Sequence, residues 1–210
     1  EYFSSLRSDR SIDHSDLVIL VLDASELITD QDKKIIQYVI DQKRNMLLFI
    51  NKWDLTKEAS EFQEDLEDVT LLNSIDQDDD TLVELSQEHA IERCHGMMPI
   101  LKNYPILFGS ALENEGVSIL FDYIPDIISR SHSRISTGEL NRFVEQVITA
   151  NPPFSKTGRP LKIFYVTQAE VHPPTFVFFA NDASIVTVNY RRYVERKIRE
   201  FMGSLEGISI

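Results

Sequence analysis

The sequence predicts an α/β unit with a mostly parallel sheet, followed by a smaller α+β unit. Short apolar runs at 17–22, 46–50 and 104–108 alternate with segments of helical periodicity, and such runs suit strands buried on both faces of a parallel sheet.

The charge also changes along the chain. Residues 1–134 hold 12 Lys and Arg against 27 Asp and Glu (net −15), whereas residues 135–210 hold 9 against 7 (net +2). We therefore expect two units with different partners.

The composition excludes several classes of protein. The 210 residues carry a net charge of −13, which argues against generalised nucleic-acid binding. The single cysteine, Cys94, excludes an intrachain disulfide and fits a reducing cytosol. No apolar run approaches the ~20 residues of a membrane span, and the first residues lack the apolar core of a signal peptide. Because the chain does not start with methionine, we expect it to begin inside a longer protein.

The first unit begins with a predicted short helix over 1–15 and a buried strand over 17–22. The segment Thr29-Asp30-Gln31-Asp32 predicts the start of a helix, because threonine caps helices well and carboxylates are stabilised in the first turn. The strand at 46–50 follows. Strand, helix and strand within about thirty-five residues form a βαβ unit, whose crossover is nearly always right-handed.

An acidic, less regular segment separates the second strand from the third. We expect a helix over 58–68, a polar loop over 73–80, and another helix with Leu82, Leu85 and His89 on one face. The aspartates of the loop lack the glycine turn and terminal glutamate of a calcium site. The neighbouring histidines and single cysteine do not make up a zinc ligand set. We therefore expect no bound metal here.

The strand at 104–108 and a helix over 117–129 complete the first unit, and the polar residues 129–134 are expected to link it to the second. Ser136 and Glu139 form the pattern of a capping box at the start of a helix. Prolines after Asn151 end that helix. The later elements of the second unit are predicted as strand, strand, helix and the start of a strand, over 163–171, 176–180, 189–201 and 208–210.

Polar residues follow the second strand directly, in the order Asn51-Lys52-Trp53-Asp54. In an open α/β sheet, ligands lie beyond the carboxyl ends of the strands. Asn-Lys-x-Asp at this place indicates guanine recognition, because the Asp54 carboxylate can accept from both the N1–H and the N2–H₂ of guanine. Adenine would leave the carboxylate unpaired, and a desolvated site rejects such an analogue by roughly 10⁴-fold. Lys52 can lie along the base, and the Asn51 amide can hold a neighbouring loop.

A second motif, Gly109-Ser110-Ala111-Leu112, follows the third strand. Its small residues allow the Ala111 backbone N–H to approach the guanine O6, while Ser110 can brace the turn. With Leu112, these residues can close over the base. Either motif alone could be ordinary loop chemistry, but each directly follows a predicted buried strand, and they occur in this order. We therefore interpret the first unit as binding GTP or GDP.

On these motifs, the chain resembles the carboxyl-terminal half of the EngA (Der) family of bacterial GTPases, which have two tandem G domains and a KH-like domain. Residues 16–23 resemble the strand after switch II, and the two motifs resemble the fourth and fifth G motifs. The stretches that resemble the KH-like domain are 136–141, 151–153, 159–163 and 171–174. The resemblance implies a partial P-loop-NTPase-type G domain over 1–130, from the switch II helix onward, and a KH-like domain over 135–210.

Three features depart from the family pattern. Neither a Gly-x-x-x-x-Gly-Lys-[Ser/Thr] phosphate loop nor an Asp-x-x-Gly is present, so the implied ligands of the phosphates and Mg²⁺ are expected upstream. No residue of this chain is expected to act in hydrolysis. The acidic segment around 68–92 is longer than usual for the family. The Gly-x-x-Gly loop of ordinary KH domains is missing.

The resemblance implies a cytoplasmic GTPase in assembly of the large (50S) ribosomal subunit. Its implied partners are that subunit or its precursor rRNA, and an upstream G domain of the same protein. The alternative is a G-domain remnant that does not hydrolyse GTP and serves as a docking scaffold for RNA or protein. A gene segment upstream of Glu1 that encodes a phosphate loop would favour the GTPase.

The second unit is expected to contact RNA or the ribosome, because basic side chains bind phosphates by releasing counterions. The candidate residues are Lys156, Arg159, Lys162, Arg191, Arg192, Arg196 and Lys197, with Arg199 in the same predicted cluster on one helix. Alternatively, this basic helix balances the charge of the acidic first unit.

Overall fold

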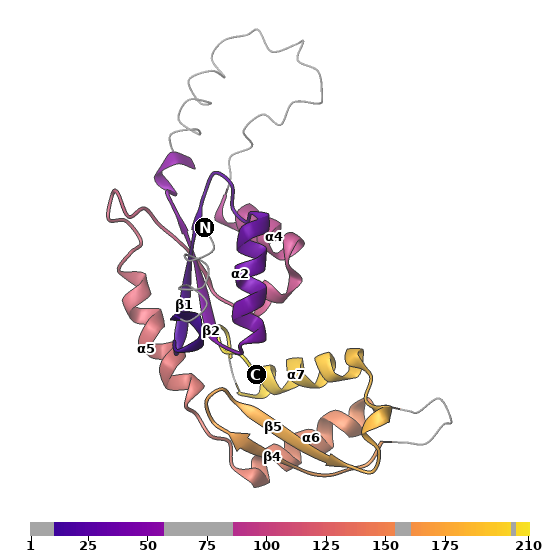
Figure 1. Ribbon diagram of the computed structural model, residues 1–210. Helices are drawn as coiled ribbons and strands as arrows, with labels where there is room; N and C mark the ends of the chain where they lie inside the picture. The colour runs from indigo at the N-terminus through magenta and orange to yellow at the C-terminus, as the bar shows by residue number, and fades with distance from the viewer. Residues whose placement is uncertain (1–10, 57–85, 154–160, 203–204) are drawn as a thin grey trace, which may run out of the picture.

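The computed structural model describes residues 11–56, 86–153, 161–202 and 205–210 (Figure 1). It contains a three-stranded parallel sheet in the order β1-β2-β3 and a separate antiparallel pair, β4-β5. The predicted mixed α/β fold with a parallel sheet is therefore confirmed.

The first unit consists of β1 (Leu17–Asp23), α2 (Asp30–Asp41), β2 (Asn45–Asn51), α4 (Gln87–Met97), the 3-10 helix η1 (Pro99–Asn103), β3 (Ile106–Phe108) and α5 (Ile119–Ser131). The second unit consists of α6 (Thr137–Ala150), β4 (Ile163–Glu170), β5 (Thr175–Ala180), the 3-10 helix η2 (Ala183–Ile185) and α7 (Val188–Met202).

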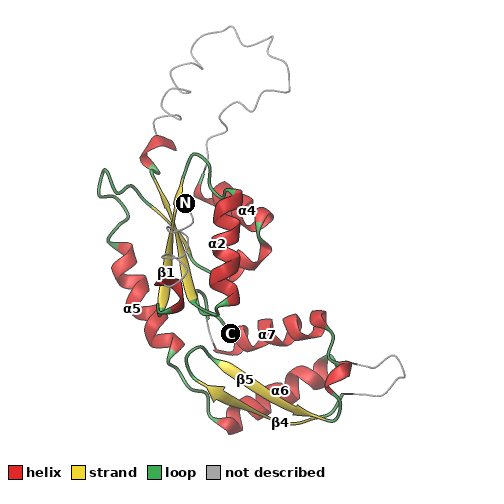
Figure 2. Ribbon diagram, viewed as in Figure 1, coloured by secondary structure: helices red, strands yellow, loops and turns green. Residues whose placement is uncertain are grey.

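Helices cover both faces of the parallel sheet, with α2 and α4 on one face and α5 on the other (Figure 2). The central strand β2 is buried along its whole length before Asn51. Its Met46, Leu48 and Ile50 belong to the core on the side of α2 and α4. Its Leu47 and Phe49 belong to the core on the side of α5. The prediction of a strand buried on both faces is confirmed for β2.

The same prediction is wrong for β1. Among the described residues this strand pairs only with β2, so it forms an edge of the sheet. Leu17 packs into the core on the side of α5. Further along that face, Ile19 and Val21 remain 37% and 58% exposed because the described helices do not cover them.

The third strand is shorter than predicted, spanning Ile106–Phe108 instead of 104–108. Tyr104 follows η1 as its C-cap, with its N–H donating to the Leu101 carbonyl. Pro105 has no N–H to donate to a strand ladder. Its carbonyl nevertheless accepts from the Leu48 N–H at 2.9 Å, so β3 is aligned with the middle of β2.

The helix starts follow the predicted capping chemistry. Thr29 caps α2 in a capping box: its hydroxyl accepts from the Asp32 N–H, and the Asp32 carboxylate accepts from the Thr29 N–H. Ser136 caps α6, because its hydroxyl oxygen accepts from the Glu139 N–H. The Glu139 carboxylate, however, accepts from the Ser136 hydroxyl instead of from the Ser136 backbone N–H. Helix α5 ends at Ser131, two residues later than predicted, so the link to the second unit is shorter than 129–134.

The second unit has its own small core. Helix α6 packs Leu140 and Val144 against Val166 of β4. The strands β4 and β5 lie within one residue of their predicted bounds. Figure 1 shows this unit at the end of the parallel sheet where β2 begins.

The predicted strand at 208–210 is wrong, because the last residues pack onto the first unit instead. The Met46 N–H donates to the Gly207 carbonyl at 2.9 Å, and Ile208 is fully buried in the core on the side of α5. Gly207 has φ +81°, a conformation that favours glycine. The Arg199 guanidinium donates to the Leu205 and Ile208 carbonyls at 2.9 and 2.8 Å. The chain end thus joins α7 to the start of β2.

Several predicted features lie outside the described residues: most of the helix over 1–15, the helix over 58–68, the loop over 73–80, Leu82, Leu85, Lys156 and Arg159. Within the described ranges, no helix has the length and apolar character needed to cross a membrane.

We expect Ile208→Ala to lower the free energy of unfolding of the first unit by about 2–4 kcal/mol, because it leaves a cavity beside Leu47 and Ile127. The control Val188→Ala changes a side chain that is 67% exposed on α7 and should cost less than about 0.5 kcal/mol. Trp53 fluorescence during urea unfolding measures both. Equal, small effects would contradict the docking of the chain end.

Candidate guanine-nucleotide site

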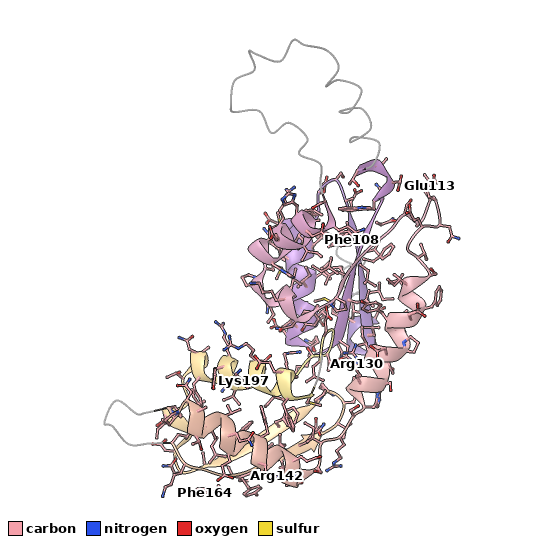
Figure 3. All side chains as sticks on the ribbon, turned by 180° about the vertical axis from the view of Figure 1, so that it is seen from behind. Phe108, Glu113, Arg130, Arg142, Phe164 and Lys197 are labelled. Atoms are coloured by element: carbon pink, nitrogen blue, oxygen red, sulfur yellow. The ribbon has the colours of Figure 1, made fainter. Side chains whose placement is uncertain are left out.

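The carboxyl ends of β2 and β3 bring the two predicted motifs together. The parallel register places Ile50 opposite Phe108. Beyond it, the Gly109 N–H donates to the Ile50 carbonyl at 3.0 Å, and the Trp53 N–H donates to the Gly109 carbonyl at 3.1 Å. The buried Trp53 ring meets the Phe108 ring edge-on at 4.5 Å. Figure 3 shows Phe108 and Glu113 at this end of the first unit, far from Arg142 and Lys197.

Asn51 holds the second motif in place. Its side-chain Oδ1 accepts from the Ala111 backbone N–H at 2.9 Å, so the expected link between the Asn51 amide and a neighbouring loop is present. The same bond engages the Ala111 N–H, the group that is predicted to donate to guanine O6. A guanine O6 that accepts from this N–H must therefore share it with Asn51 Oδ1 or displace that oxygen.

Asp54 carries a buried oxygen without a partner among the described residues. Its Oδ1 is shielded from solvent and accepts no hydrogen bond there. A buried polar atom left unpaired costs about 1–3 kcal/mol, and more when it is charged. A ligand that donates hydrogen bonds to this carboxylate would remove that cost. Guanine offers two such donors, so the geometry fits the predicted role of Asp54.

Lys52 is held by a residue that sequence reasoning missed. Its Nζ lies 2.5 Å from Oδ2 of Asp23, the last residue of β1. This bond, with further hydrogen bonds from Ser25, lowers the pKa of Asp23 to about 2. The Asp23 carboxylate in turn raises the pKa of Lys52. Asp23 directly follows the predicted strand at 17–22, just as the two motifs directly follow the next two predicted strands, and this position could have indicated it as a site residue.

The second motif forms a tight loop. Ser110 is buried, and its hydroxyl accepts from the Glu113 N–H at 3.1 Å, as the predicted bracing requires. Gly116 has φ +73°, and a side chain there would overlap the Phe108 carbonyl. Leu112 is 84% exposed, so this structure does not place it over another group.

The described residues contain no group of three or more His, Cys, Asp or Glu side chains that could hold a metal ion.

The basic residues Arg191, Arg192, Arg196, Lys197 and Arg199 all lie on α7, as predicted, but their surroundings differ. Arg191, Arg192 and Arg196 are exposed. Lys197 pairs with Glu200 at 2.6 Å. Arg199 is turned inward, with its side chain only 11% exposed and bonded to the chain end. Lys162, which precedes β4, is also exposed.

Two family models match consecutive parts of the chain. The model described as the elongation factor Tu GTP binding domain matches residues 3–130. The model described as KH-domain-like of EngA bacterial GTPase enzymes, C-terminal, matches residues 134–210. The fold and these matches define a protein with a GTP-binding domain of the G-domain type and an appended KH-like domain.

Curated relatives give the particular family. The proteins named GTPase Der from Chlorobium luteolum, Thermomicrobium roseum and Desulfitobacterium hafniense are 37%, 37% and 34% identical over 210, 205 and 203 residues. The alignments cover 100%, 98% and 97% of this chain but 42%, 40% and 41% of the relatives. The chain belongs to the EngA (Der) family of GTPases, and it spans less than half the length of these relatives.

We expect Gly116→Ala to weaken GDP binding by the full-length protein at least about tenfold, because the side chain strains the loop that carries Ala111. The matched control is Gly138→Ala in the first turn of α6, where an added Cβ meets nothing within 4 Å. That change should leave GDP binding as it is and stabilise the helix by up to about 1 kcal/mol. Calorimetric titration with GDP compares the two, and similar affinities would contradict the prediction.

Proposed function

We propose that the full-length protein containing this chain is a GTPase that binds GTP and GDP between the two motifs. The residues assigned to the guanine base are Asn51, Lys52, Asp54, Ser110, Ala111 and Leu112. The proposal divides the chain into a partial G domain over 1–130 and a KH-like domain over 135–210. The phosphate cradle, the Mg²⁺ ligands and the groups that position the attacking water are assigned to segments outside this chain.

The observation that carries the nucleotide assignment is the unpaired, buried Oδ1 of Asp54. It lies in a loop that the Trp53 N–H ties to Gly109, two residues before Ala111, whose N–H is proposed to donate to O6. The membership of the EngA (Der) family and the match to a GTP-binding domain support the same ligand.

We further propose a cytoplasmic role in assembly of the 50S ribosomal subunit, as the family resemblance implies. The KH-like domain is the proposed contact with the subunit or its precursor rRNA, and an upstream G domain of the same protein is the proposed intramolecular partner. The exposed charges of Lys162, Arg191, Arg192 and Arg196 support this surface. The proposed contact set also includes Lys156, Arg159 and Lys197.

The proposed guanine contact is tested by Asp54→Asn in the full-length protein, which should shift the base preference from guanine toward xanthine. Xanthine keeps the N1–H but carries an oxygen at C2, which repels a carboxylate and accepts from an asparagine N–H₂. The substitution is nearly isosteric, so the packing of Trp53 should survive. A mismatched buried polar pair costs about 1–3 kcal/mol, hence about tenfold or more in relative affinity.

Displacement of labelled GDP by GDP and XDP measures this preference on the wild type and the variant. If the variant keeps the wild-type preference for GDP over XDP, Asp54 does not recognise the base. A protein that binds GDP in this way but releases no phosphate from GTP would instead support the scaffold alternative.

The proposed ribosome contact predicts that charge reversal at Arg191 and Arg192 weakens co-sedimentation with ribosomal subunits, most strongly at low salt. The control reverses Lys34 and Lys43, which are exposed on the first unit and change the net charge equally. Equal binding of both variants across a salt titration would contradict a specific role of α7.

A further inference from the structure

Asp23 is the last residue of β1 and lies opposite Asn51 in the parallel register. Both of its carboxylate oxygens are engaged. Oδ2 lies 2.5 Å from Lys52 Nζ, while Oδ1 accepts from the Ser25 N–H at 2.9 Å and from the Ser25 hydroxyl at 2.7 Å. The Lys52 bond is the main cause of the low pKa of Asp23, about 2, so the group is a carboxylate at neutral pH.

The ion pair between Asp23 and Lys52 contributes little to folding. The side chains are 33% and 55% exposed, and solvent screens pairs of this kind until their net contribution to stability is small. The pair instead decides where the Lys52 ammonium lies, at the edge of the sheet where the two motifs meet.

Two further carboxylates act on the same ammonium. The charges of Glu26 and of Asp54, which is two residues from Lys52, also raise the pKa of Lys52, Glu26 more than Asp54 and both less than Asp23. Lys52 has φ +63°, uncommon outside glycine, and its Nζ reaches Asp23 on the neighbouring strand instead of Asp54 in its own loop. Asp54 Oδ1 is accordingly unpaired among the described residues. An ammonium on Asp54 would occupy an acceptor that guanine requires.

We propose that Asp23 is a positioning residue for base recognition: it holds the Lys52 ammonium so that the Asp54 carboxylate stays available to the N1–H and N2–H₂ of guanine. This inference rests on the proposed function, in which Asp54 accepts from the base. Asp23 itself does not touch the nucleotide in this account, and it acts through Lys52.

The test is Asp23→Asn in the full-length protein, with GDP and IDP as the probes. Asparagine can still accept from Ser25 but lacks the charge that holds Lys52, so the ammonium moves to Asp54. IDP keeps the N1–H of GDP and lacks the 2-amino group, so the ratio of the two affinities reports the bond from N2–H₂ to Asp54. We expect this ratio to fall about tenfold, the effect of one hydrogen bond to a charged acceptor. A merely structural role for Asp23 would weaken both ligands equally.

Two controls separate the charge of Asp23 from its place in the loop. Ser25→Ala removes a hydroxyl bond to Asp23 but leaves the ion pair, so the ratio of GDP to IDP affinity should stay at the wild-type value. In a Lys52→Met background there is no ammonium to redirect, so adding Asp23→Asn should change the ratio no further. Asp23→Glu keeps the charge and should retain most of the ratio.

The outcomes are distinct. The inference alone would be overturned if Asp23→Asn left the ratio of GDP to IDP affinity unchanged. It would also be overturned if Ser25→Ala lowered this ratio as much as Asp23→Asn, or if Asp23→Asn still lowered it in full in the Lys52→Met background. A wild-type protein that binds GDP and IDP equally would overturn the proposed guanine contact, and this inference with it.

Discussion

The structure depends on the burial of β2 on both faces. A strand with apolar side chains on both sides must be covered by two layers, here α2 with α4 and α5. Its two ends are bonded in different ways. At its start, Met46 bonds to the chain end that follows α7, and at its finish Asn51 bonds to the loop after β3. The strand therefore connects the second unit physically to the candidate nucleotide site.

The carboxyl edge of the sheet is organised by hydrogen bonds and charges more than by apolar contact. The Trp53 N–H and the Asn51 amide fix the loop after β3 relative to β2, while Asp23 holds Lys52. The ion pair of Asp23 and Lys52 is partly exposed, so it adds little to the free energy of folding. Their effect is to pre-organise donors and acceptors, and one acceptor, Asp54 Oδ1, remains unpaired within the described residues. An edge of this kind suits a flat, polar ligand.

Apolar periodicity and capping residues were sufficient to predict most elements of the fold. Thr29 and Ser136 marked helix starts correctly, and the run at 46–50 marked a fully buried strand. The sequence could not show that the similar run at 17–22 forms a partly exposed edge, because exposure depends on which strands and helices lie beside it. It also could not show that the chain end packs on the first unit, since Ile208 in a short apolar segment fits either a strand or a docked tail. The two motifs lie side by side, as predicted. Asp23, the partner of Lys52, is brought there by the register between β1 and β2, which a single sequence does not give.

The central claim is that the Asp54 carboxylate binds the guanine base, and a crystal structure of the full-length protein with GDP tests it most directly. We predict both Asp54 oxygens at about 2.7–3.2 Å from N1 and N2 of the base, with Lys52 Nζ still on Asp23. A guanine ring bound elsewhere, or Asp54 paired with Lys52 while the base is present, would contradict it.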